Sequence, residues 1–97
     1  MEFGYSNKFK KSAKKIGKSN LKYKLKINDC IKDFQKKLFN SKYYRKKLKN
    51  YKNCHSLTVT GDIRIVIEIL IKDNKCYFLN IGTHSDLEIS SEKRNKF

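Results

Sequence analysis

The sequence VTGDIRIVIEILIKDNKCYFLNIGTHSDL, residues 59–87, decides the fold. Isoleucine occupies every second position from Ile63 to Ile71, and this period of two in β-branched residues predicts a strand with one buried face. The dipeptide DN at 73–74 is typical of a turn, and the segment CYFLNI at 76–81 predicts a returning strand. The stretch therefore predicts an antiparallel hairpin at the centre of a small sheet.

Polar residues gather at the two ends that this hairpin brings together. Arg64 lies near the start of the first strand, and His84 lies in GTHSD, at the end of the second. Because antiparallel strands run in opposite directions, we expect Arg64 and His84 to be near neighbours. An arginine in an isoleucine-rich strand is favoured where its side chain meets an anion, either a phosphate or a carboxylate of Asp62 or Glu68. His84 is either a titratable site residue or a solvated loop histidine.

Two helices are predicted before the hairpin. The first begins after a cap at residue 6 or 7 and ends at Gly17. The second begins after a cap at Ser19 or Asn20 and ends near residue 40. Their apolar stripes recur every three or four residues and consist of Phe9, Ala13 and Ile16, and of Tyr23, Ile27, Cys30 or Ile31, Phe34 and Leu38.

The remaining segments complete the predicted architecture. Residues 2–5 predict an edge strand, and residues 54–60 predict the strand before the hairpin. Residues 42–53 show no clean period and are expected to form a connection packed down by Leu48 and its tyrosines. The predicted fold class is α+β, with two N-terminal helices packed on a small, mainly antiparallel twisted sheet. Residues 1–97 are expected to form one domain with a frayed tail at about 89–97.

The excess of positive over negative charge is confined to the first half of the chain. Residues 1–52 hold 18 Lys/Arg and 3 acidic residues, whereas residues 53–97 hold 6 of each. Such a surface attracts nucleic acid or an acidic protein partner, although lysines also simply solvate helices. In residues 42–53 basic residues alternate with tyrosines, an arrangement that either grips single-stranded RNA or only packs the loop.

Other classes of function are disfavoured. The sequence has no apolar run of membrane-spanning length and no signal-peptide core, and its three cysteines lack metal-ligand spacing, so we expect a cytoplasmic protein. No phosphate-binding glycine motif and no acidic metal cluster occurs, so no cofactor or metal is expected. Cys54 and His55 are adjacent in a strand and point to opposite faces, which excludes a thiol–imidazole pair.

Three segments together resemble a known family. They are FKKSAKKI at 9–16, VTGDIRIV at 59–66 and IGTHSDL at 81–87. Over roughly residues 3–88 the chain is similar to the RelE/YafQ-type toxins of bacterial type II toxin–antitoxin modules, in the RelE/ParE superfamily. This resemblance implies a RelE-like fold and an mRNA interferase, a metal-independent endoribonuclease that cleaves mRNA in the ribosomal A site. It also implies a cognate antitoxin that holds the enzyme inactive.

The resemblance assigns roles to individual residues. His84 matches the family's C-terminal histidine or arginine and is expected to act as general acid or base, while Arg64 matches the arginine that clamps the scissile phosphate. His55 falls near positions that are basic in relatives and would be a second proton carrier. Asp62 matches an acidic position of some relatives and would orient His84 or Arg64. The expected RNA-binding residues are Lys47, Lys49, Tyr51 and Lys52.

One position departs from the family pattern. After GTHSDL relatives usually carry Tyr or Phe, but here Glu88 follows. Either Tyr51 or Tyr77 replaces that ring, or catalysis is weakened. Two alternatives therefore stay open: a ParE-like gyrase poison without nuclease activity, and a relic that binds RNA or antitoxin without cleavage.

Overall fold

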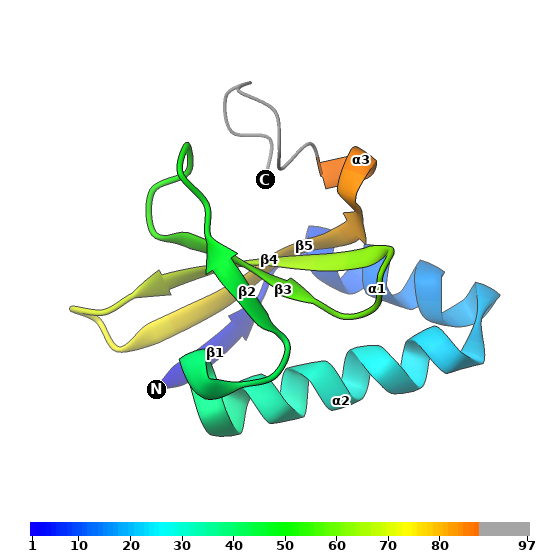
Figure 1. The fold of residues 1–97 in the computed structure, drawn as a ribbon, viewed down its shortest axis with the longest axis horizontal. Coiled ribbons are helices and arrows are strands. Elements are labelled where there is room, and N and C mark those ends of the chain that lie inside the picture. The colour runs from blue at the N-terminus through cyan, green and yellow to red at the C-terminus, as the bar shows by residue number, and fades with distance from the viewer. Residues whose placement is uncertain (88–97) are drawn as a thin grey trace.

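The computed structural model describes residues 1–87, and within them five strands form one sheet (Figure 1). The strand order is β1-β5-β4-β3-β2, with β1 parallel to β5 and the other neighbours antiparallel. The elements are β1 (Glu2–Tyr5), α1 (Asn7–Ser19), α2 (Leu21–Lys37), the 3-10 helix η1 (Leu38–Asn40), β2 (Tyr44–Lys47), β3 (Cys54–Thr58), β4 (Ile63–Leu70), β5 (Lys75–Thr83) and α3 (His84–Leu87). The predicted α+β fold class is confirmed. Glu88 and the expected frayed tail at 89–97 lie outside the described residues.

The predicted hairpin is formed by β4 and β5, and its register pairs Ile63 with Thr83 and Ile65 with Ile81. The turn at 71–74 contains Asn74 at φ 54, a left-handed value that asparagine tolerates well. One part of the prediction is wrong. Ile71 is 78% exposed, because β4 ends at Leu70 and the isoleucine begins the turn instead of facing the core.

Both helix starts match the predicted caps. The Ser6 hydroxyl oxygen accepts a hydrogen bond from the Phe9 N–H at 2.9 Å, and the Asn20 side chain accepts one from the Lys22 N–H at 2.9 Å. The predicted end of α1 at Gly17 is wrong, since the helix continues to Ser19. Gly17 is buried where α2 passes close by: a Cβ added there would lie 3.3 Å from the Lys24 Cβ.

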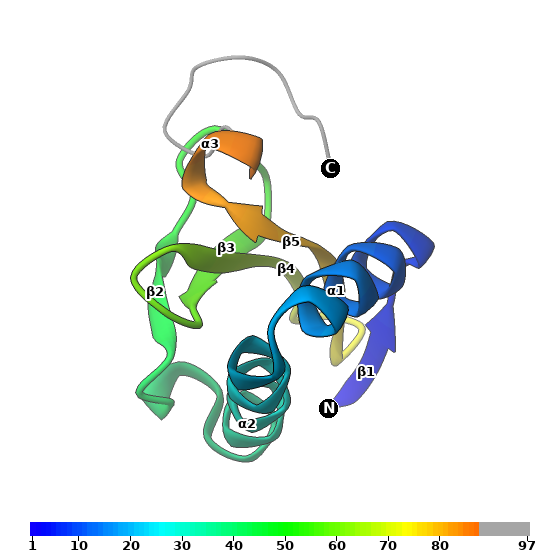
Figure 2. The ribbon, with the colours of Figure 1, turned by 90° about the vertical axis from the view of Figure 1, so that its right-hand side faces the viewer.

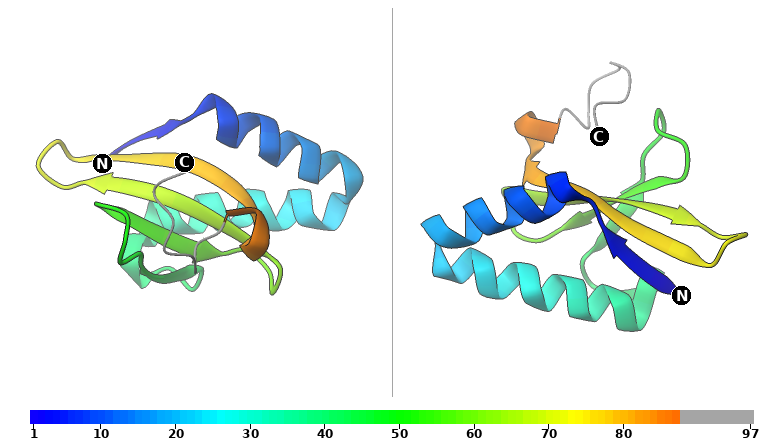
Figure 3. Two further views of the ribbon diagram at one scale, coloured as in Figure 1. Left: turned by 90° about the horizontal axis from the view of Figure 1, so that it is seen from above. Right: turned by 180° about the vertical axis from the view of Figure 1, so that it is seen from behind.

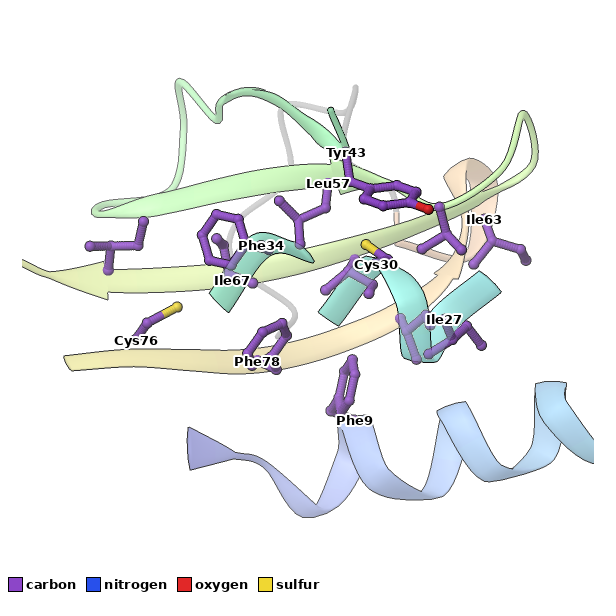
Figure 4. Close-up of a cluster of buried hydrophobic side chains, with 14 residues drawn as sticks. Phe9, Ile27, Cys30, Phe34, Tyr43, Leu57, Ile63, Ile67, Cys76 and Phe78 are labelled. Atoms are coloured by element: carbon purple, nitrogen blue, oxygen red, sulfur yellow. The ribbon is translucent and has the colours of Figure 1, made fainter. Parts of the chain in front are cut away.

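The main core lies between the two helices and one face of the sheet (Figures 2 and 4). Phe9, Ile27 and Phe34 of the predicted helical stripes pack there against the isoleucines of β4. Cys30 and Cys76 are small core residues, and burial raises the pKa of each thiol to about 12. In the described part of the chain, no helix is both long and apolar enough to cross a membrane.

The sheet extends further than predicted and buries part of its second face. Residues 44–47, expected in an irregular connection, form β2 and pair with β3. On the face opposite the helices, a smaller cluster fixes the β2–β3 loop and α3 to the sheet; it contains Leu48, Tyr51, Cys54, Val66 and Leu87, with Leu79 packed against it. The prediction that β4 buries only its isoleucine face is therefore incomplete.

Candidate functional site

The polar residues of the candidate site lie on the face of the sheet opposite α1 and α2, which we call the open face. The β2–β3 loop and α3 rise from opposite sides of this face (Figures 1 and 3). Across it the register aligns Thr58 of β3 with Arg64 of β4, and Arg64 with Gly82 of β5. Arg64 therefore lies beside the start of the GTHSD segment, on the side of the sheet that the long helices leave uncovered.

Arg64 is anchored to the turn between β3 and β4. Its Nη1 donates hydrogen bonds to the backbone oxygens of Thr60, at 2.9 Å, and Gly61, at 3.1 Å. Among the described residues it forms no ion pair with Asp62 or Glu68, so the expected alternative of a salt bridge along the strand is wrong. A guanidinium carries five N–H donors, and this anchoring leaves several available for an incoming anion.

His84 is the first residue of α3 and is exposed. The Asp86 N–H donates to the Thr83 hydroxyl oxygen at 3.0 Å, and the Thr83 N–H donates to the Asp86 carboxylate at 3.4 Å, which forms a reciprocal capping box. Leu87, only 2% exposed, anchors the other end of α3 in the smaller core. Gly82 permits this close packing, because a Cβ there would lie 3.2 Å from the Asp86 Cβ. The motif thus holds the backbone that carries His84.

Asp62 lies in the exposed turn between β3 and β4. Its backbone N–H donates to the Thr60 hydroxyl at 3.1 Å. Within residues 1–87 its carboxylate makes no hydrogen bond or ion pair with Arg64 or His84. The expected role of Asp62 in orienting either residue therefore has no contact to support it, and Thr83 and Asp86 brace the His84 backbone instead.

His55 does not join this site. It shares a strand face with Leu57 of the main core, whereas Arg64 lies on the open face. Its Nδ1 lies 2.9 Å from the Tyr44 hydroxyl, and its ring centroid lies 5.3 Å from that of Phe39. Burial, and secondarily the nearby charge of Lys47, lower the pKa of His55. The structure thus contradicts the expected pairing of His55 with His84 as proton carriers.

The expected RNA-binding residues divide into two groups. Lys47, Lys49 and Lys52 are exposed and line a shallow depression along the β2–β3 loop. Tyr51 lines it too but is 3% exposed, because its ring packs in the smaller core, so it cannot stack on a base in this conformation. Tyr77 packs its ring against Gly4, where a Cβ would lie only 2.8 Å away. Tyr51 therefore offers no exposed ring in place of the aromatic residue that Glu88 replaces, and Tyr77 is half-buried with its ring against Gly4.

Sequence reasoning missed three polar residues of the open face. Ser56 pairs with Val66, and Val66 with Asn80, which places both polar residues in the row beside Arg64; they are 2% and 7% exposed. Thr58 belongs to the Arg64 row itself. The signal was the alternation in CHSLT, since Leu57 in the core requires Ser56 and Thr58 to face the other way.

The described residues contain no group of three or more His, Cys, Asp or Glu side chains that could hold a metal ion. The Cys54 thiol is an unsuitable nucleophile, because burial and then the charge of Glu68 raise its pKa to about 11. Among the described residues, the groups with chemical potential on the open face therefore include the His84 imidazole, the Arg64 guanidinium, the Glu68 carboxylate in register with Cys54, several hydroxyls and the adjacent lysines.

No family model and no curated protein matches the sequence. Solved structures do share the fold. A YoeB/ParE toxin from Agrobacterium tumefaciens matches with a TM-score of 0.74 at 14% identity, over 87% of this chain and 99% of that one. A metal-bound toxin from Helicobacter pylori matches with a TM-score of 0.70 at 23% identity, over 90% and 98%. A chain of the Escherichia coli DinJ–YafQ toxin–antitoxin complex matches with a TM-score of 0.71 at 19% identity, over 89% and 94%. The chain thus has the fold of these toxins, as the resemblance of its motifs implied.

Proposed function

We propose that this protein is the toxin of a toxin–antitoxin module and acts as a metal-independent endoribonuclease on mRNA at the ribosome. The observation that carries the proposal is the pairing of Arg64 with Gly82, which places a guanidinium beside the segment that carries His84, on the open face. The β2–β3 loop, which carries Lys49 and Lys52, rises from the same face (Figure 1), whereas Lys47 is in register with His55. A polyanion on this face would therefore contact cationic side chains as well as the His84 imidazole.

The chemistry requires few groups. A base removes the proton of a ribose 2′-OH, and the oxygen attacks the adjacent phosphorus as the bond to the 5′-oxygen breaks. A cyclic 2′,3′-phosphate forms, and the leaving oxygen takes up a proton. Arg64 is assigned to the charge that develops on the phosphate oxygens, and His84 to one of the two proton transfers. Because His55 lies on the other face, the second transfer falls to water or to a group of the RNA or ribosome.

An antitoxin is the proposed protein partner. One of the structures that share this fold is a chain of the DinJ–YafQ toxin–antitoxin complex, in which a toxin is bound to its antitoxin. The excess of basic residues in the first half of this chain favours an acidic partner.

The second candidate is a gyrase poison without nuclease activity. It is favoured by the separation of His55 from His84 and by the burial of Tyr51, which leave few catalytic groups on the open face. The two candidates make different predictions for the same samples.

The deciding experiment maps mRNA cleavage on translating ribosomes by primer extension, with a gyrase supercoiling assay in parallel. We compare wild type with His84→Ala, using exposed Ser85→Ala as the matched control. Cuts made by wild type and Ser85→Ala, resistant to EDTA and lost in His84→Ala, would support the nuclease. Growth arrest without cuts, together with inhibited gyrase, would support the second candidate and refute the first.

A further inference from the structure

A basic hollow on the outer edge of the sheet lies beyond the residues assigned above. It is lined by Lys42, Tyr44, Arg45, Lys46 and Thr58, and no carboxylate is among these residues. The three cationic side chains are exposed, and in the described part of the chain none of them forms an ion pair. Three unneutralised cations around one hollow make it a favourable place for an anion.

A β-bulge shapes this hollow. The β2–β3 register pairs Tyr44 with Leu57 and then Lys46 with Ser56, so that Arg45 is the extra residue on β2. A bulge bends its strand and changes the direction of the side chains around it, and bulges are common beside functional sites. Here it places two consecutive cations at the edge of the sheet that borders the open face.

The polar group of Thr58, at the inner side of the hollow, is unsatisfied. Its hydroxyl oxygen is shielded from solvent and has no hydrogen-bond partner among the described residues, although its backbone N–H donates to the Tyr43 oxygen at 2.7 Å. Buried hydroxyls usually have a partner, and an exception calls for an explanation. An anion that displaces the flexible side chains of Arg45 or Lys46 would supply the missing acceptor.

The hollow is in line with Arg64. Thr58 is the register partner of Arg64, and β2 is the next strand outward. Since neighbouring strands lie about 5 Å apart, the hollow and Arg64 are separated by roughly one to two strand spacings. An extended nucleic acid strand that crosses the sheet at Arg64 would therefore pass over the hollow.

We propose that Arg45, Lys46 and Thr58 form a subsite that binds a backbone phosphate of single-stranded RNA, next to the phosphate held by Arg64. The subsite rests on the proposed function for the identity of the polyanion, and it adds a second fixed point that sets the direction and register of the strand. Lys42 contributes less, because its ammonium lies over the Tyr43 ring, 5.3 Å from the centroid.

Binding and cleavage must be measured separately. The probe is a fluorescent RNA of about ten nucleotides with 2′-O-methyl sugars, which lacks the attacking hydroxyl and cannot be cleaved. Its affinity is measured by anisotropy over a range of salt concentrations for wild type and Arg45→Ala/Lys46→Ala. The matched control, Lys22→Ala/Lys26→Ala, removes the same charge from exposed positions of α2.

We expect Arg45→Ala/Lys46→Ala to weaken binding at least tenfold and to reduce the slope of log affinity against log salt by about 0.7, the value for the loss of one phosphate contact on a single strand. The control should change both quantities much less. Equal effects of the two double variants would overturn the subsite, since they would show attraction by net charge alone. Loss of affinity for the antitoxin with unchanged RNA affinity would also overturn it, by making the hollow a protein contact.

Thr58 provides a test that does not depend on charge. Thr58→Val keeps the shape and removes the unpartnered hydroxyl, so binding should weaken severalfold while the urea midpoint stays equal or rises. Thr58→Ser should restore binding. Unchanged RNA affinity in Thr58→Val would remove this residue from the subsite. If the variants weaken probe binding as expected but wild type never cuts mRNA, the subsite is supported and the nuclease proposal is refuted. If wild type cuts mRNA but the variants bind the probe as tightly as wild type, the nuclease proposal is supported and the subsite is refuted.

Discussion

Arg64 shows how one polar residue fits a strand of isoleucines. The strand alternation turns its side chain away from the core, and two backbone oxygens of the preceding turn fix one end of the guanidinium. The sequence indicated an anion at this position. The hydrogen-bond acceptors of Arg64 in the structure are instead two neutral backbone carbonyl groups. Their oxygens bear partial negative charge and orient the guanidinium without neutralising it. An oriented, uncompensated cation suits a site for a transferred or cleaved phosphate.

The anchoring of Arg64 predicts that lysine is a poor substitute. Arg64→Lys keeps the charge but loses the planar fork that reaches two carbonyls, so the free energy of unfolding should fall by about 1 kcal/mol. Urea unfolding measures this change, with exposed Arg45→Lys as the control of the same chemistry, expected to change it by less than about 0.5 kcal/mol. Identical midpoints for the two variants would show that the two hydrogen bonds contribute nothing to stability.

His55 predicts a pH dependence of stability. Its pKa in the folded protein lies below the ordinary value of 6.5, so under acid conditions the unfolded chain binds a proton that the folded protein resists. Stability should be fully present above pH 6.5 and decline as the pH falls through the folded pKa. Urea midpoints at pH 7.5 and 5.5 should therefore differ more in wild type than in His55→Gln. An equal decline in both proteins would assign the pH dependence to other groups.

At the scale of elements, the hydrophobic periodicity of the sequence predicted the elements that pack in the core. It did not predict the exposed edge strand. The β4–β5 hairpin and the stripes of α1 and α2 are buried, so the spacing of their apolar residues was enough to predict them. The edge strand β2 is mostly exposed and bulged, and its residues YRKK carry no alternation. Likewise Gly17 was read as a helix end, whereas it provides room for a neighbouring helix that local sequence does not reveal.

The position of a candidate site residue in the fold could likewise be predicted only where it lies in or beside a strongly patterned element. The GTHSDL and GDIR motifs identified His84 and Arg64, because each lies at the end of a strongly patterned strand. His55 was misplaced although its strand was predicted, because the sequence did not show which face the helices cover. The burial of Tyr51 depends on contacts with Val66 and Leu87, distant in sequence, which no local pattern encodes.

The capping box of α3 predicts coupled effects on stability and activity. Thr83→Ala and Asp86→Ala should each cost about 1 kcal/mol, because each removes the side-chain acceptor of one backbone N–H at the start of α3. If His84 acts in cleavage, both variants should also slow it without altering the affinity for an uncleavable RNA. Urea unfolding and single-turnover cleavage measure these effects. Unchanged unfolding in both single variants would argue against the two hydrogen bonds.

The whole molecule carries a large positive net charge, which the contacts among residues 1–87 hardly compensate. The net charge is +15, and within the described residues a single ion pair occurs, between Lys37 and Asp33 at 3.4 Å. Most lysines lie on or beside the helices, while the open face adds its own cations. Such a molecule repels itself and becomes more stable when anions surround it, which links the stability of the fold to the presence of a polyanion or acidic partner.

This imbalance predicts an unusual salt response. The urea midpoint should rise when sodium chloride increases from about 0.05 to 0.5 M, because screening reduces repulsion among the many lysines more than it weakens ion pairs such as that of Lys37 with Asp33. Potassium acetate at the same ionic strength provides the control for specific chloride binding. A midpoint that falls with salt would indicate that attractive pairs dominate.

The parallel pairing of β1 with β5 has a consequence for biosynthesis. The Ser6 hydroxyl donates to the Leu79 oxygen at 2.6 Å across a separation of 73 residues, and among residues 1–87 β1 pairs with no strand except β5. At about 5 to 20 residues per second, the first strand waits several seconds for its partner to be made and longer for it to leave the exit tunnel. A nascent chain therefore cannot complete its sheet early. If the protein damages the translation machinery, this delay keeps it harmless to the ribosome that is making it.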